Sequence, residues 1–104
     1  MQLREMAHAR TGDKGNVVSI SLIARRDEYF EVLRQQVTAE RVTSHFAGLV
    51  ERPALRYEIP HLRALNFVLF RPDDQAVTRS LALDAHGKCL ASGLLALEIE
   101  YVGD

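Results

Sequence analysis

Near the start of the chain, an acid and a base stand between two glycines. They belong to the polar run Arg-Thr-Gly-Asp-Lys-Gly-Asn at residues 10–16. Glycine takes positive φ readily, so successive backbone N–H groups in such a run can form a concave anion site. Its two cations would strengthen the attraction. The run predicts a loop that binds a small anion, and its candidate binding residues are Arg10, Gly12, Asp13, Lys14, Gly15 and Asn16.

Other uses of this run remain open. Glycine, aspartate and asparagine are also the residues of any tight turn, in which Asp13 and Asn16 would hydrogen-bond the neighbouring backbone. The run lacks the glycine, four residues and Gly-Lys-Ser/Thr of a phosphate-binding P-loop. Its neighbours have the pattern of strands, which also argues against the nucleotide-clamping loop of a KH module.

Three further side chains are candidates for chemistry. Asn66 is the one polar side chain of a strongly apolar segment, so its amide needs a hydrogen-bond partner, and we add it to the binding residues. His45, near the end of a predicted helix, and Asp13 are candidate proton carriers. No histidine pair has the spacing of metal ligands on a helix face, so we expect no metal, and we expect no cofactor.

Composition excludes several classes of protein. The 104 residues include 13 basic and 14 acidic side chains, a net charge of −1, which leaves no overall field for nucleic acid or a membrane surface. A hydrophobic fraction of 47% argues against disorder. Because Cys89 is the lone cysteine, the chain cannot be a small scaffold held by internal disulfides. No apolar run is long enough to span a bilayer, which excludes a transmembrane helix. We expect a cytoplasmic protein that forms a single domain over residues 1–104.

The periodicity predicts alternating strands and helices. Strands are predicted at residues 3–9, 17–23, 55–59, 77–83 and 95–101, and helices at 27–37, 38–49 and, fully buried, 61–70. A hairpin is predicted at 84–88 and a bulge at Gly93. The order favours an α+β ferredoxin-like sandwich, with a mostly antiparallel sheet of four to five strands and helices on one face.

The other sheet face is predicted to be open. The charged residues of two predicted strands alternate with apolar ones, so we expect the charged ones on this open face. They are Arg56, Glu58, Glu98 and Glu100. The face would be solvated or would form a subunit interface, and a homodimer is the simplest assembly.

The same residues resemble a known family. Over about residues 7–100 the chain resembles the C-terminal domain of the acyclic terpene utilisation protein AtuA. The segments that carry the resemblance are Ala-Arg-Thr-Gly-Asp-Lys-Gly-Asn at 9–16, Ser-Ile-Ser-Leu-Ile-Ala-Arg at 19–25, Thr-Ala-Glu-Arg-Val at 38–42 with His-Phe at 45–46, Arg-Tyr-Glu-Ile-Pro at 56–60, Ala-Leu-Asn-Phe-Val-Leu at 64–69 and Ser-Leu-Ala-Leu-Asp at 80–84 with Gly-Lys at 87–88.

This resemblance implies a ferredoxin-like fold and a place in bacterial catabolism of acyclic terpenes and related acids through acyl-CoA thioesters. It covers the small domain of those proteins without the larger one, which implies a partner chain carrying the large AtuA domain. The first hypothesis is therefore an accessory or ligand-binding subunit. The second is a small enzyme for an acyl-CoA or carboxylate, with Arg10 and Lys14 on the anion, Asp13 or His45 moving protons and Asn66 orienting the substrate. The third is a structural or oligomerisation module.

Overall fold

The computed structural model describes residues 1–71 and 87–101, and of Asp13 and residues 87–89 it describes the backbone alone. Its centre is a four-stranded antiparallel sheet in the order β1-β2-β4-β3. The strands are β1 (Ala7–Lys14), β2 (Val17–Ala24), β3 (Leu55–Ile59) and β4 (Ala64–Phe70). The predicted strand 77–83 lies outside the described residues.

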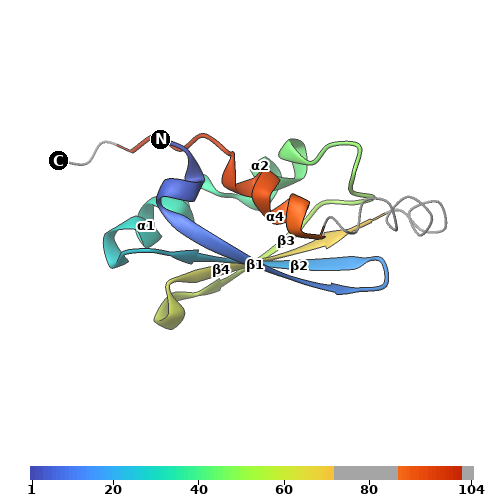
Figure 1. Ribbon diagram of the computed structural model, residues 1–104, viewed down its shortest axis with the longest axis horizontal. Helices are drawn as coiled ribbons and strands as arrows, with labels where there is room; N and C mark the ends of the chain where they lie inside the picture. Colours follow the sequence, from blue (N-terminus) through green and yellow to red (C-terminus); the bar gives the residue numbers. More distant parts are fainter. Residues whose placement is uncertain (72–86, 102–104) are drawn as a thin grey trace.

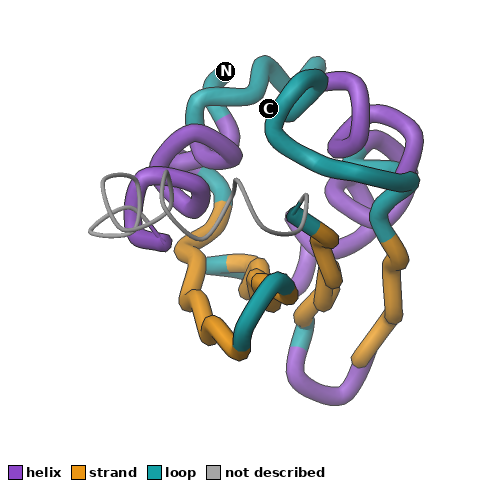
Figure 2. Tube along the Cα trace, turned by 90° about the vertical axis from the view of Figure 1, so that its right-hand side faces the viewer, coloured by secondary structure: helices purple, strands orange, loops and turns teal. Residues whose placement is uncertain are grey.

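The helices cover one face of this sheet. In Figures 1 and 2 they lie on one side of the strands, apart from the short 3-10 turn between β3 and β4. They are α1 (Asp27–Gln36), α2 (Ala39–His45) and α4 (Gly87–Leu95), with 3-10 turns η1 (Leu3–Glu5) and η2 (Pro60–Leu62). This is the ferredoxin-like α+β arrangement that the sequence predicted.

The core lies between the sheet and the helices. Residues of β2 alternate between buried and half-buried, so Val18, Ile20 and Leu22 point into the core, as the alternation at 17–23 predicted. Leu33 of α1 and Leu94 of α4 are fully buried against the same layer. Thr38 starts α2, because its hydroxyl accepts a hydrogen bond from the Arg41 backbone N–H at 3.1 Å.

The prediction of a buried helix at 61–70 is wrong. After η2, residues 64–70 form β4, which lies between β2 and β3. Leu65, Phe67 and Leu69 are buried beneath the helices, whereas Asn66, Val68 and Phe70 are half-buried on the other face. A central strand with apolar residues on both faces loses its period of two, so its leucines matched a helical spacing by coincidence.

The predictions for residues 84–101 are also wrong where the structure describes them. Gly87 and Lys88 belong to α4, and Gly93 lies inside this helix rather than at a bulge, beside the ring of Phe46. After α4 the chain is extended and forms only an isolated bridge between Glu98 and Gln2. The segment is held to the N-terminal region by backbone hydrogen bonds such as Leu3 N–H to Leu97 O at 2.8 Å.

The charged side chains of β3, Arg56 and Glu58, point toward the helices and away from the open face. Arg56 Nη1 donates to the backbone carbonyls of Arg34 at 2.8 Å and Val37 at 3.1 Å, at the carboxyl end of α1, and Nη2 donates to Glu58 at 2.9 Å. These are carbonyls that a helix leaves without intrahelical partners. The expectation that Arg56 and Glu58 lie on the open face is therefore wrong, and Leu55, Tyr57 and Ile59 lie there.

We predict that Arg56→Met lowers the free energy of unfolding by about 1–2 kcal/mol, because the carbonyls at the end of α1 lose a charged donor. Urea unfolding followed by circular dichroism measures the change. Arg4→Met is the matched control, since the exposed Arg4 side chain has no hydrogen bond or ion pair with a described residue. Equal destabilisation by the two substitutions would contradict this role of Arg56.

Candidate functional site

Most of the predicted anion loop is strand. β1 continues through Lys14, which pairs with Val17, so only Gly15 and Asn16 form the turn. Gly15 has φ +65, and Asn16 is not among the described non-glycine residues with positive φ, which fits a type II′ hairpin turn. Gly12 is not in the positive-φ region. The loop predicted over residues 10–16 is therefore a turn of only two residues. The predicted concave anion site needed two glycines with positive φ, and only Gly15 has one.

Arg71 holds this turn in place. Its backbone N–H donates to the Asn16 carbonyl at 2.8 Å, and its Nη2 donates to the Gly15 carbonyl at 2.9 Å. Both turn carbonyls therefore have a partner at the end of β4. This arrangement supports a structural role for the turn itself, and it moves attention to the strand residues before it.

The functional candidates of β1 stand on the open face of the sheet. The cross-strand register places Arg10 beside Ser21, Gly12 beside Ser19 and Lys14 beside Val17. None of the residues that the register assigns to this face is acidic. They are His8, Arg10, Gly12, Lys14, Val17, Ser19, Ser21, Ile23, Leu55, Tyr57, Ile59, Ala64, Asn66, Val68 and Phe70.

Asn66 forms the polar centre of this face. Its Nδ2 donates to the hydroxyls of Ser19 and Ser21, each at 3.0 Å. The prediction that the Asn66 amide needs a hydrogen-bond partner is confirmed, although Asn66 lies on a strand and not on a helix. The Asn66 Oδ1 accepts no hydrogen bond from a described residue, so it is available to a ligand or another chain.

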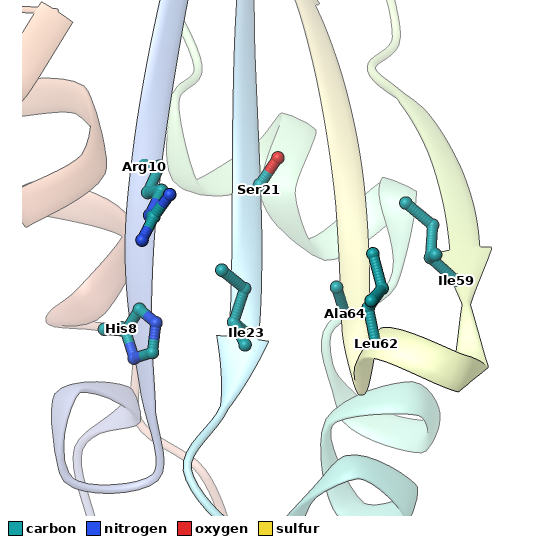
Figure 3. Close-up of a pocket in the computed structure, with 7 residues that line it drawn as sticks. All are labelled: His8, Arg10, Ser21, Ile23, Ile59, Leu62 and Ala64. Carbon is teal, nitrogen blue, oxygen red and sulfur yellow. The ribbon is translucent and has the colours of Figure 1, made fainter.

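A hollow of about 400 Å³ opens on the same face, next to Arg10. Figure 3 shows its lining side chains on one side of the sheet, from β1 across to β3, with the helices behind. Apart from the Ser21 hydroxyl, its floor and far wall are apolar, and the nitrogen-bearing side chains of its lining come from β1. The lining residues are His8, Arg10, Ser21, Ile23, Ile59, Leu62 and Ala64.

The charge of β1 on this face has no acidic partner among the described residues. Neither Arg10 nor Lys14 forms an ion pair with a described residue, whereas Arg34 pairs with Glu31, Arg56 with Glu58 and Arg63 with Asp27. The hydrogen bond from Arg34 lowers the pKa of Glu31, and this pair lies on α1, away from the open face. An arginine without a carboxylate partner beside an apolar hollow suits an amphipathic anion.

The candidate proton carriers do not join this site. His45 ends α2 in the helix layer, where its Nε2 lies 2.7 Å from the Gly93 carbonyl of α4. Arg10 and Asn66 point to the opposite side of the sheet. Asp13 is a β1 residue whose side chain lies outside the described part of the structure. A proton-transfer role for either residue stays a prediction, as does ligand binding by the residues of the 10–16 run.

The described ranges contain neither a metal-binding cluster nor a membrane-spanning helix. Residues 1–71 and 87–101 contain no group of three or more histidine, cysteine, aspartate or glutamate residues arranged to hold a metal ion. Within the same ranges no helix has the length and apolar character needed to cross a membrane.

The family model of the AtuA ferredoxin-like domain matches residues 1–100. The chain belongs to this family. The match confirms the resemblance drawn from the glycine run and its neighbours, and it agrees with the α+β architecture. No curated protein and no solved structure matches the chain significantly, so the AtuA family is the one relationship that the comparisons establish.

Sequence reasoning missed most of the hollow. The sequence indicates only strand positions for Ile23 and Ile59 and a helical one for Leu62, and it considers His8 only as a histidine without a partner at metal-ligand spacing. A signal was present in β2, where Ile23 has the parity of Ser19 and Ser21 and so belongs to the face away from the core. The hollow itself depends on β4 being a strand, which brings Ala64 and Leu62 beside Ile23.

We predict that Gly15→Ala lowers the free energy of unfolding by about 1–2 kcal/mol, since an L residue at φ +65 is strained. Gly12→Ala is the matched control. A Cβ at Gly12 would meet no atom within 4 Å, and its φ is not in the positive region, so a change within about 0.5 kcal/mol is expected. Thermal or urea unfolding compares them. Similar stabilities of the two variants would argue against the turn assignment.

Proposed function

We propose that this AtuA-related domain is an accessory, ligand-binding subunit in the cytoplasmic catabolism of acyl-CoA thioesters and terpenoid-type acids. Its functional surface is the open sheet face, to which Arg10 and Lys14 of the 10–16 run belong, rather than the turn at Gly15. The observation that carries the proposal is Arg10, which has no acidic partner among the described residues and borders the apolar hollow.

The chemistry of the hollow suggests how a ligand would bind. A guanidinium offers paired N–H donors to a carboxylate or phosphate, and such charge-assisted hydrogen bonds are stronger than neutral ones. The apolar residues Ile23, Ile59 and Leu62 would receive a hydrocarbon chain, whose transfer from water is favourable. An acid with an apolar tail matches both halves. The size of the hollow lies at the lower end of the range for small-molecule sites.

The small-enzyme hypothesis has less support. His45 and Arg10 belong to opposite sides of the sheet, so they would not act together on one bound substrate. We also propose that the domain works with a chain that carries the larger AtuA domain, for which family membership is the support.

We predict that decanoate binds the chain and that Arg10→Gln raises its dissociation constant about tenfold or more, because a charge-assisted hydrogen bond is lost. Isothermal titration calorimetry measures this, with decanoyl-CoA in a parallel titration to separate a carboxylate site from a CoA site. Leu62→Ser, at a side chain that is 57% exposed, is expected to weaken binding about threefold or more by removing apolar contact.

Arg34→Gln on α1 is the matched control and should leave both titrations unchanged, because Arg34 pairs with Glu31 in the helix layer. Unaltered affinity in Arg10→Gln would refute the site, as would the absence of binding by both ligands. The accessory role has its own experiment. Affinity purification of the tagged chain from its native cells should recover a chain with the large AtuA domain, whereas recovery of the chain alone, with full activity on a thioester, would contradict it.

A further inference from the structure

The open sheet face has an exposed apolar edge. Leu55 and Tyr57 of β3 are 43% and 52% exposed, and both point away from the helices. They are exposed there because the charged residues of β3 are used on the helix side, where Arg56 binds the end of α1. An apolar sheet edge left in water is a mark of an interaction surface.

The opposite edge of the same face is basic, and the two edges are in register. Arg10 of β1 pairs across to Ser21, Ser21 to Asn66, and Asn66 to Tyr57, so these four residues form one row perpendicular to the strands. Arg10 and Tyr57 are three strand spacings apart within one chain, so their Cα atoms are separated by about 14 Å. They therefore do not contact each other intramolecularly.

We propose that a second copy of this chain covers the face, related by a twofold axis that runs parallel to the strands between β2 and β4. Such an axis keeps each row opposite itself and exchanges the two edges. β1 of one copy then lies over β3 of the other, and β2 lies over β4. Two sheets packed face to face in this way have the ordinary spacing of about 10 Å.

At the edges, this arrangement pairs unlike groups. Arg10 comes to lie over the ring of Tyr57 of the second copy, and the symmetry makes the contact twice. A guanidinium over a tyrosine ring is a favourable cation–π contact, and it is stronger when both groups leave water. The basic edge that has no acidic partner among the described residues thus meets an aromatic partner of the same sequence.

At the centre, the polar groups are also complementary. The Ser21 hydroxyl accepts from Asn66 Nδ2, which leaves its O–H to donate, while Asn66 Oδ1 accepts nothing from the described residues. The twofold axis places Ser21 of one copy over Asn66 of the other. The hydroxyl can therefore donate to Oδ1 across the interface, and the reciprocal bond follows from symmetry.

The charge pattern selects this orientation of the second copy. A twofold axis running across the strands would place β1 over β1 and would bring Arg10 and Lys14 of the two copies together. Juxtaposed like charges at an interface are costly, and the described strands place no carboxylate on this face to neutralise them. The axis along the strands avoids this conflict.

Sedimentation velocity on the ligand-free chain and two charge variants tests the arrangement. We expect a monomer–dimer equilibrium in the wild type. Tyr57→Glu and Tyr57→Arg remove the same exposed ring, but they place opposite charges against Arg10 of the second copy. Tyr57→Arg should raise the dimer dissociation constant about tenfold or more, and Tyr57→Glu should change it less than about threefold.

The double variant Arg10→Glu with Tyr57→Arg exchanges the charges and should recover most of the dimerisation lost in Tyr57→Arg. Circular dichroism confirms that each variant is folded. A wild type that stays monomeric at high concentration would overturn the proposal. Equal weakening by the two Tyr57 substitutions, no effect of either, or no recovery in the double variant would do so as well. Because no ligand is present, these results are independent of the fatty-acid titrations.

Discussion

The hydrogen bonds of Arg56 decide which side of β3 faces the helices. The guanidinium binds two carbonyls at the end of α1, and its side chain is only 19% exposed. A strand places alternate residues on opposite faces, so directing Arg56 and Glu58 toward the helices directs Leu55, Tyr57 and Ile59 toward solvent. The apolar edge of the open face and one wall of the hollow follow from this single register.

The sequence predicts an element well where one face is polar and the other apolar. β2 satisfies this condition, because Ser19 and Ser21 alternate with core residues, and its prediction is confirmed. β4 does not, because Val68 and Phe70 make its outer face apolar too, so its sequence also suits a helix. At the carboxyl end, Gly87 suggested a hairpin turn but begins α4. The alternation of Leu95, Leu97, Ile99 and Tyr101 suggested a strand where the described chain forms an isolated bridge at Glu98.

The site, too, could be predicted only in part from the sequence. The glycine run identified Arg10 and Lys14 as unusual cations, and the structure places both on the open face without an acidic partner in the described residues. The residues beside them could not be predicted from local sequence, because the hollow joins residues from β1, β2, β3, β4 and η2. The face of β3 was predicted wrongly because an arginine has two uses. Its head can be solvated, or it can cross the edge of a sheet to bind a helix end.

Ligand binding and self-association are compatible on one sheet face. The hollow is lined mainly by the row of His8, Ile23, Ala64 and Ile59, and it shares Arg10 and Ser21 with the next row, where the proposed contact of Arg10 with Tyr57 lies. A twofold axis along the strands keeps each row opposite itself, so the hollows of two copies would face each other. An acid bound there would be shielded from water, which strengthens its attraction to Arg10. Exposed apolar side chains, cations without an acidic partner among the described residues, and a hollow therefore all belong to one face, which the described helices leave open.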